Sequence, residues 1–438
     1  MHSRNFLALF AKEWRELLAS RAFWMLLLMI GPLVGHGFIA AVNLYAEVSG
    51  IGGGPSALAQ GLTPLDGILV PTFGAYDLAA TFLFPFVAIR AIAAEKESGG
   101  WKLLLQLPGS LALKITTKAL VLLCGWLVAW LPGLVAICLW EIYGGHLYAP
   151  ETANLLLGHL LRVTLSGGIA VAAAALAESA ASAAIVTLGL TVGTWVLDFI
   201  AAGRGGLLQQ LAAYTPTAAL RSFEQGLLSL STIVVMLGFS AAGFTVCAIW
   251  LDTGRKLQAR ALRLAGALGI LAVLIISAAG FSRSSWDMSE NRRNSFAPDD
   301  EAALRQIQSP LQVTVFLSPE DPRLTDLEQS VLGKMRRILP RLEVDYAALS
   351  QSGLFETGAD HYGEIWYEMN GRKVMERSTI EPVVLGQIYK VAGINPPQRT
   401  QKFEFNGYPL AARPAWAALI FYALWPLATI LAWRLTRR

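Results

Sequence analysis

Charged residues are scarce in this chain of 438 residues. Asp, Glu, Lys and Arg make up 15% of it, and 54% is hydrophobic, whereas a soluble domain carries about 25% charged residues. The net charge of +4 is mild, and the basic residues lie beside apolar runs, which favours orientation in a membrane over nucleic-acid binding. The composition therefore predicts an integral membrane protein in contact with lipid and excludes a nucleic-acid partner.

Cysteine is also rare, and histidine is scattered. Cys124, Cys138 and Cys247 all lie in apolar runs, so the sequence has no disulfide framework, no C-x-x-C motif and no zinc spacing. No two histidines have the spacing of metal ligands, and no Ser/His/Asp arrangement is supported. We therefore predict no metal site and no catalytic residue. The histidines are His2, His36, His146, His159 and His361.

The chain lacks the phosphate-binding motif G-x-x-x-x-G-K-[ST] as well. Its Gly-Lys pair, Gly333-Lys334, has Glu328 where the first glycine of the motif should be. Nothing in the sequence would hold the phosphates of ATP, and we expect no cofactor on this chain.

Long apolar runs are abundant. A spanning helix needs about 20 mostly apolar residues, and we predict eight of them. The weakest contains Arg162, which is costly in mid-membrane, so we expect this side chain near the outer end or facing the protein interior. The predicted spans are 22–45, 73–94, 119–143, 155–176, 183–202, 232–251, 264–281 and 415–433.

Lys and Arg flank alternate ends of these runs. The loops 46–72 and 144–154 contain neither residue. By the positive-inside rule both termini are then cytoplasmic, and the polar segment 282–413 lies outside. The flanking cations are Arg4, Lys12, Arg15, Arg21, Lys96, Lys102, Lys114, Lys118, Arg255, Lys256, Arg260, Arg263, Arg434, Arg437 and Arg438.

The segment 1–21 precedes the first span. Its aromatic residues Phe6, Phe10 and Trp14 recur at helical spacing, and its charges lie elsewhere on the helical wheel. This pattern predicts a helix that lies in the cytoplasmic membrane interface. A cytoplasmic helix packed on protein is the alternative.

The stretch 95–110, between the second and third spans, is short, amphipathic and interrupted by Pro108. It cannot span, so it is either a rigid contact for a cytoplasmic partner or a solvated loop. It resembles the signature of type-2 ABC permeases, Glu-x-Glu-x-Gly-Thr followed by leucines and Pro-x-Ser; Gly100 and Gly109 depart from it. The resemblance implies a coupling helix that docks on a separate ATPase. The implied coupling residues are Glu95, Glu97, Gly99, Trp101, Leu104 and Pro108.

A second match to this family lies before the sixth span. The stretch 203–231 is too polar to span and rich in Leu and Ala. It resembles the family's outer helical hairpin, which implies a re-entrant gate; a plain outer loop is the alternative. The implied gate residues are Tyr214, Pro216, Phe223 and Gly226.

The outer segment 282–413 reads as an α/β domain. Strands are predicted at 312–317, 343–349, 363–369 and 372–377, the last two around the hairpin signal Asn370-Gly371. Helices are predicted at 326–341 and, capped by Thr379, to residue 392. The order β-α-β then β-β-α is that of a thioredoxin-like domain, without cysteine for redox chemistry. The stretches 286–307 and 362–393 resemble the outer domain of gliding-motility-type ABC auxiliary subunits, whose second outer half is missing here.

Together these resemblances imply an α-helical membrane protein of the bacterial inner membrane, with a six-span permease core and two further spans. Its parts are an entry helix (1–21), the core (22–256), a seventh span (257–281), a periplasmic α/β domain (282–413) and an eighth span with a cytoplasmic tail (414–438). The implied function is that of the permease subunit of an ABC exporter. A second copy of the chain and two ATPase subunits, which carry ATP and Mg²⁺, are the expected partners, and spans two and five are expected to line the path between the two copies.

Two other functions remain open at the level of the sequence. The first is mechanical transduction, in which ATP hydrolysis moves the outer domain against a periplasmic protein and nothing crosses the bilayer. The second is a membrane anchor for the outer domain, which one span would serve. Four further polar residues lie in or near the spans and are candidates for function or for headgroup contact. They are Asp77, Arg90, Glu178 and Asp198.

Overall fold

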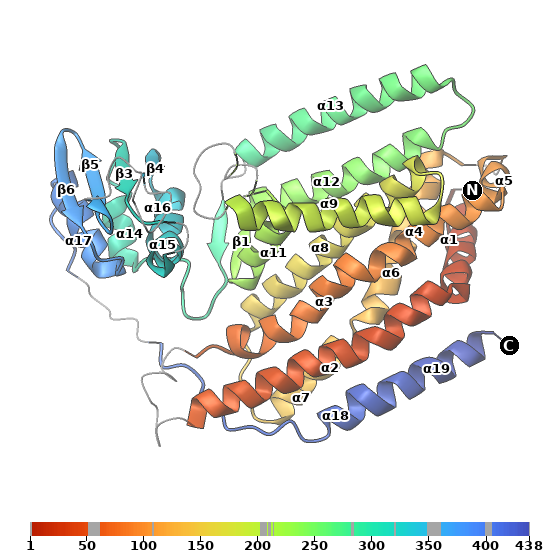
Figure 1. Ribbon diagram of the computed structural model, residues 1–438, viewed down its shortest axis with the longest axis horizontal. Helices are drawn as coiled ribbons and strands as arrows, with labels where there is room; N and C mark the ends of the chain where they lie inside the picture. The colour runs from red at the N-terminus through yellow and green to blue at the C-terminus, as the bar shows by residue number, and fades with distance from the viewer. Residues whose placement is uncertain are drawn as a thin grey trace. The chain divides into compact units, whose positions relative to one another are not determined.

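The computed structural model describes residues 2–50, 62–106, 109–201, 208, 212, 214–281, 284–318, 321–347, 361–398 and 405–437. The chain divides into two compact units (Figure 1). The helical unit comprises Met1–Gly193, Ser229–Ser284 and Asn406–Arg438. The α/β unit comprises Ser285–Phe405 together with Thr194–Leu228, which includes most of the predicted hairpin 203–231.

Among the described residues, eight helices are long and apolar enough to cross a membrane, which confirms the predicted number and places. Most of these helices begin several residues before the predicted span, because a helix can include polar residues that are left out of an apolar run. They are α2 (Arg21–Gly50), η1-α3-α4 (Leu65–Glu97), α6-α7 (Leu111–Ile142), α8 (Ala149–Leu176), α9 (Ala180–Ala201), α12 (Leu230–Trp250), α13 (Leu257–Phe281) and α18-η4-α19 (Ala417–Thr436).

Two of these spans are interrupted next to a proline. The π-helical turn η1 (Leu65–Leu69) leads into α3 (Val70–Phe82), and α4 (Phe84–Glu97) follows with Pro85 in its first turn. In the third span, α6 (Leu111–Ala129) gives way to α7 (Leu131–Ile142) beside Pro132. Proline removes a backbone donor and clashes with the preceding turn, so a helix bends there.

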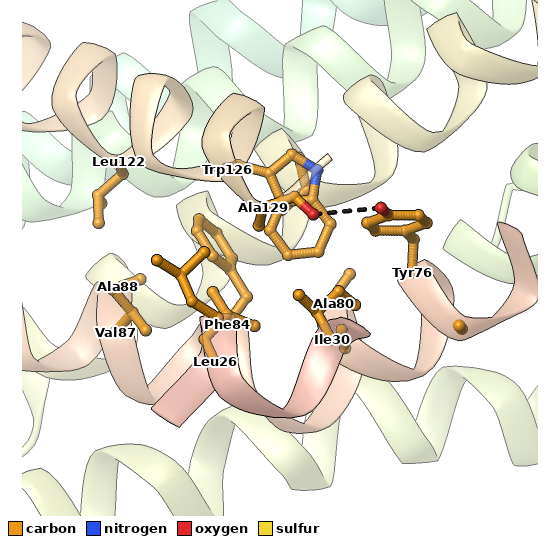
Figure 2. Close-up of a cluster of buried hydrophobic side chains, with 14 of the residues drawn as sticks. Leu26, Ile30, Tyr76, Ala80, Phe84, Val87, Ala88, Leu122, Trp126 and Ala129 are labelled. Carbon is orange, nitrogen blue, oxygen red and sulfur yellow. Dashed lines mark hydrogen bonds between the residues drawn. The ribbon is translucent and has the colours of Figure 1, made fainter. Parts of the chain in front are cut away.

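The second bend is held open by a buried tyrosine (Figure 2). The Tyr76 hydroxyl donates to the carbonyl of Ala129 at 3.1 Å and accepts from the amide of Gly133 at 2.8 Å. These are the two groups that an unbroken α-helix would join to each other. Trp126, about one turn before Ala129 in α6, packs edge-on against Phe84 of the second span, with ring centroids 5.1 Å apart. Side chains of the second span therefore shape the third.

The helices α8 and α12 approach each other most closely at two glycines. A Cβ on Gly168 would lie 2.8 Å from the carbonyl oxygen of Ser240, and one on Gly243 would lie 2.3 Å from that of Gly168. Small residues let membrane helices pack backbone against backbone. By contrast α13 packs along α12, with Ile275 over Gly238, but none of its own residues is buried.

The α/β unit contains a four-stranded sheet of order β4-β3-β5-β6. β3 (Leu311–Val315) is parallel to β4 (Leu342–Tyr346) and antiparallel to β5 (Ile365–Met369), which pairs with β6 (Arg372–Glu376). All four strands are where the sequence predicts them. Asn370 and Gly371 both have positive φ, 52° and 76°, as the predicted two-residue hairpin requires.

Helices complete this unit. The predicted helix 326–341 begins earlier, because Asp321 caps it and Pro322 starts it; it runs as α15 (Pro322–Leu327), η2 (Glu328–Leu332) and α16 (Gly333–Ile338). The predicted cap Thr379 is wrong: α17 (Glu381–Ala392) starts after Ile380, and the Thr379 hydroxyl donates to Asp326 at 3.0 Å. The other elements are α14 (Pro298–Leu304), α11 (Pro216–Glu224), and the pair β1 (Leu227–Ser229) and β2 (Ser285–Asp287).

Candidate functional site

A short helix, α5 (Gly100–Gln106), lies between α4 and α6 at one end of the helical unit. Two side chains, one on α5 and one just before it, connect this region to other helices. Trp101 Nε1 donates to the carbonyl of Leu251 after α12 at 3.0 Å. Lys96 Nζ donates to three carbonyls at the end of α8, with distances of 2.7–3.0 Å. The basic segments that border α4, α6 and α12 therefore share one end of the unit.

The C-terminus of α5 is held by a buried cation. Lys114, in the first turn of α6, donates to the carbonyl of Leu104 at 2.7 Å. A cation at a helix C-terminus satisfies free carbonyls and complements the helix dipole. With Trp101 near one end and Lys114 at the other, α5 is attached at both ends.

The predicted coupling residues fall on two faces. Trp101 and Leu104 are buried and anchor α5, whereas Glu97 and Gly99 are exposed. Pro108 lies outside the described residues. The outward face also carries Lys102 and Leu103, and 68% of Leu103 is exposed. Sequence reasoning missed Leu103; helical spacing would have found it, because the inward pair Trp101 and Leu104 leaves the position between them outside.

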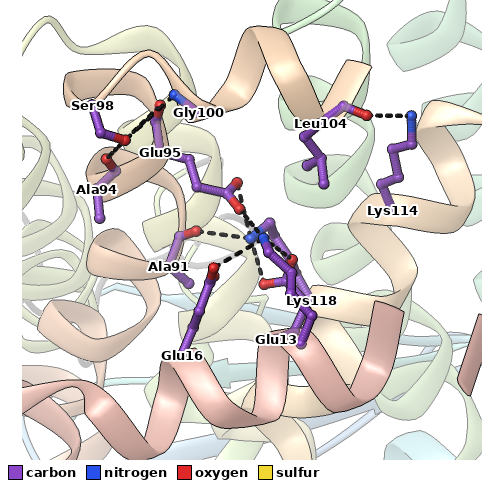
Figure 3. A network of polar contacts seen from close by, with 11 residues as sticks. Glu13, Glu16, Ala91, Ala94, Glu95, Ser98, Gly100, Leu104, Lys114 and Lys118 are labelled. Atoms are coloured by element: carbon purple, nitrogen blue, oxygen red, sulfur yellow. Dashed lines mark hydrogen bonds and ion pairs between the residues drawn. The ribbon is translucent and has the colours of Figure 1, made fainter. Parts of the chain in front are cut away.

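Glu95, the sixth predicted residue, belongs to a buried ion network (Figure 3). Lys118 Nζ lies 2.5 Å from Glu13 Oε2 and 3.0 Å from Glu95 Oε2, and it donates to the carbonyl of Ala91 at 3.1 Å. Lys12 Nζ lies 2.5 Å from Glu95 Oε1. The network joins α1 (His2–Ala19), α4 and α6. Glu95 therefore ties the entry helix to the span before α5.

The charge state of the network follows from its geometry. Burial opposes the charge of Lys12, but the hydrogen bond to Glu95 and the charge of Glu13 outweigh it and raise the pKa of the ammonium. Oxygens of Glu13, Glu16 and Glu95 lie within 4.8 Å of one another, as metal ligands do. Lys12 and Lys118 already supply the positive charge there, so the cluster is a salt-bridge network rather than a metal centre.

A cavity of about 280 Å³ lies beside this network, between α1, α4 and α6. Glu16, Arg90 and Lys118 line it together with apolar residues such as Val87 and Val121. Arg90, one of the polar candidates, is thus an exposed residue that lines this cavity, and Asp77 pairs with Arg162 instead.

The predicted gate residues lie in a turn, a short helix and a second turn. Tyr214 is exposed, Pro216 is the first residue of α11, and Phe223 is fully buried. Gly226 has φ +78°, and a Cβ there would lie 2.9 Å from Ser289. Residues 203–207, 209–211 and 213 of the predicted hairpin lie outside the described residues. The gate itself stays a prediction.

The remaining polar candidates have partners or face outward. Arg162 is buried and faces the interior, one of the two expected positions, with its Nε 2.8 Å from Asp77 Oδ1. The sequence does not predict this pair, because Asp77 and Arg162 lie 85 positions apart on different spans. Asp198 pairs with Arg221 at 3.0 Å, and Glu178 is exposed in the turn between α8 and α9.

No protein-family model, no curated protein and no solved structure matches this chain.

Removal of the Trp101 side chain is expected to release α5. Trp101→Ala deletes a buried ring and the hydrogen bond to Leu251, so the free energy of unfolding should fall by about 3–5 kcal/mol. Thermal unfolding in detergent and hydrogen exchange of the amides of α5 would measure both effects. Lys102→Ala, on the exposed side of the same helix, is the control and should stay within about 0.5 kcal/mol. Equal protection of α5 in the two variants would show that Trp101 is not its anchor.

Proposed function

We propose that this chain is the membrane subunit of an ATP-driven exporter of the type-2 ABC class, coupled to a separate ATPase chain. The observation that carries the proposal is α5: a short helix at the basic end of the unit, anchored on both sides, with an outward face that nothing in the described chain covers. That face presents Lys102 and Leu103, and Glu97 and Gly99 are exposed just before α5 begins. A leucine beside charges suits docking on a soluble protein.

The anchors make α5 suitable for transmitting force. Trp101 connects it to the end of α12, and Lys114 connects it to α6. Glu95, at the end of α4, is bound to both α1 and α6. A partner that moves α5 would therefore act on four helices together, and it can shift their equilibrium only by binding one arrangement more tightly than the other.

The expected assembly follows the class. One chain supplies half of a path, so two copies with two ATPases, which hold ATP and Mg²⁺, would form the complex in the bacterial inner membrane. Both termini would be cytoplasmic and the α/β unit periplasmic. The sheet order β4-β3-β5-β6 with parallel β3 and β4 supports the thioredoxin-like interpretation of that unit.

Mechanical transduction to a periplasmic protein is the second candidate, and one feature favours it. The last span is fastened to the first: Trp425 Nε1 donates to the carbonyl of Leu27 at 2.7 Å. The segment that leads into it is held too, because Tyr45 donates to the carbonyl of Tyr408 at 2.6 Å. A movement of α2 would thus reach the chain that leaves the α/β unit.

Affinity purification of the tagged chain in mild detergent, with mass spectrometry, tests the proposal. We expect an ATP-binding chain to copurify with the parent and to be reduced about tenfold or more by Glu97→Lys, because a reversed charge at a contact costs several kcal/mol. Glu47→Lys, at an exposed glutamate near the C-terminus of α2, is the matched control and should retain the partner.

The outcomes separate the possibilities. Absence of an ATP-binding chain from the parent preparation would contradict the proposed function. If Glu97→Lys retains the ATP-binding chain in full, the contact lies elsewhere than at α5. ATPase activity that rises with an added amphiphile would favour export, and activity that rises with a periplasmic extract protein would favour transduction.

A further inference from the structure

One face of the second span is open yet carries polar groups near its middle. Along α3 this face includes Gly74, Asp77, Leu78, Thr81 and Phe82, all at least partly exposed. The Asp77 side chain is 32% exposed. An added Cβ on Gly74, one turn before Asp77, would meet nothing within 4 Å. There is open space next to the carboxylate.

Behind this face lies a buried guanidinium. Arg162 comes from α8 and is 3% exposed. Its Nε donates to Asp77 Oδ1 at 2.8 Å, and its Nη2 donates to the Thr81 hydroxyl at 2.9 Å. Its Nη1 is buried and has no hydrogen-bond partner among the described residues. The buried cation fixes Asp77 through one oxygen and leaves the other free to accept, since a carboxylate offers about four acceptor sites.

The depth of the pair makes its exposure costly in lipid. Arg162 lies midway along α8 (Ala149–Leu176), about 20 Å from either end of that helix at 1.5 Å per residue. A charge at the centre of a bilayer costs about 2.5–3.5 kcal/mol even on the lenient insertion scale. The span α13, none of whose residues is buried, is apolar near its middle, with Ile270, Val273 and Ile276 exposed. The open face of α3, which carries charge, and the open face of α13, which is apolar, therefore suit water and lipid, respectively.

The resemblance implies that the second span lines the path. We propose that the Asp77 face is the water-exposed part of that span and that Asp77, held by Arg162, binds a hydrogen-bond donor of the transported molecule, a hydroxyl or an ammonium group. Leu78 and Phe82, on the same face, contact the apolar part of that molecule. This proposal rests on the proposed function, since a path is of use only in an exporter. It names the substrate class as amphipathic, with a donating head group.

Cysteine labelling in membrane vesicles tests the path. In a background where Cys124, Cys138 and Cys247 are replaced by Ala, Leu78→Cys should react with a membrane-impermeant methanethiosulfonate, and Val273→Cys on α13 should not. Thermal unfolding of each variant shows that it is folded. Equal reactivity of the two positions would overturn the path. The test needs no ATPase, so labelling of Leu78→Cys without a copurifying ATPase would contradict the proposed function alone.

Protection by probe amphiphiles tests the binding point. Octylamine, as its ammonium form, and octanol should slow the labelling of Leu78→Cys by about tenfold, the effect of one hydrogen bond to a charged acceptor, whereas octyl sulfonate should not. The protection by octylamine should disappear in Asp77→Asn, because the amide oxygen still accepts a hydrogen bond but carries no charge to attract the ammonium. Protection by only one probe identifies ammonium or hydroxyl as the donor. Equal protection by all three, or by none, would overturn the role of Asp77.

Discussion

Lys118→Met is expected to lower the free energy of unfolding by about 3–5 kcal/mol, the usual cost of leaving a buried charge without its partner. Lys118 is 3% exposed and lies between the carboxylates of Glu13 and Glu95. Without it, two acidic groups would face each other with only Lys12 nearby. The entry helix α1 should detach from α4 and α6. Thermal unfolding in detergent measures the loss, and proteolysis near residue 20 would report the detachment.

Two further variants compare the loss of the buried cation with the loss of a more exposed one and with the loss of a buried pair. Lys12→Met removes a cation that contacts the same carboxylates but is 38% exposed, so water replaces it and the loss should be much smaller. Lys118→Met with Glu13→Gln removes one buried charge of each sign and should recover part of the stability. If Lys118→Met proves no worse than Lys12→Met, the network does not hold α1.

The second large effect is expected from Gly243→Val. A Cβ on Gly243 would lie 2.3 Å from the backbone oxygen of Gly168, and neither helix backbone can move aside as a flexible side chain would. Overpacking usually costs about 1–3 kcal/mol, and a β-branched side chain at a backbone contact should lie at or above the upper end. Since α8 carries Arg162, separation of α8 and α12 would also disturb the pair with Asp77.

The control for this prediction is a glycine with space around it. Gly189, in α9, has nothing within 4 Å of an added Cβ. Gly189→Ala should leave the protein as stable or raise its stability by up to about 1 kcal/mol, because Ala is the better helix former. Thermal unfolding temperatures of Gly243→Ala, Gly243→Val and Gly189→Ala should rank accordingly. A Gly243→Val protein as stable as the parent would contradict the close α8–α12 packing.

Local patterns were sufficient for the long apolar helices and for the four-stranded sheet, but they did not predict β1, β2 or α14. Apolar runs predicted all eight long helices, and alternation with an Asn-Gly turn predicted the strands of the α/β unit. These predictions succeed because hydropathy, turn chemistry and proline restriction act within about 20 residues. The cap at Thr379 failed for the opposite reason: its hydroxyl binds Asp326, a residue 53 positions away in the sequence.

The outward face of α5 depended on packing. The sequence showed a short amphipathic segment at 95–110 but not which of its residues point outward. Trp101 faces inward because its indole binds a carbonyl 150 residues further along the chain. Leu103 is consequently presented to solvent, and Glu95 is turned toward Lys12 and Lys118 instead of toward a partner.

Sequence alone therefore determined the eight long apolar helices of the described residues and the α/β segment before the last of them. Only the tertiary structure decided which charges meet: Asp77 with Arg162, and Glu13 and Glu95 with Lys118. The physical reason is the distance along the chain over which each feature is determined. Burial of an apolar run is a property of the run itself, whereas an ion pair depends on how distant helices are rotated and spaced when they pack.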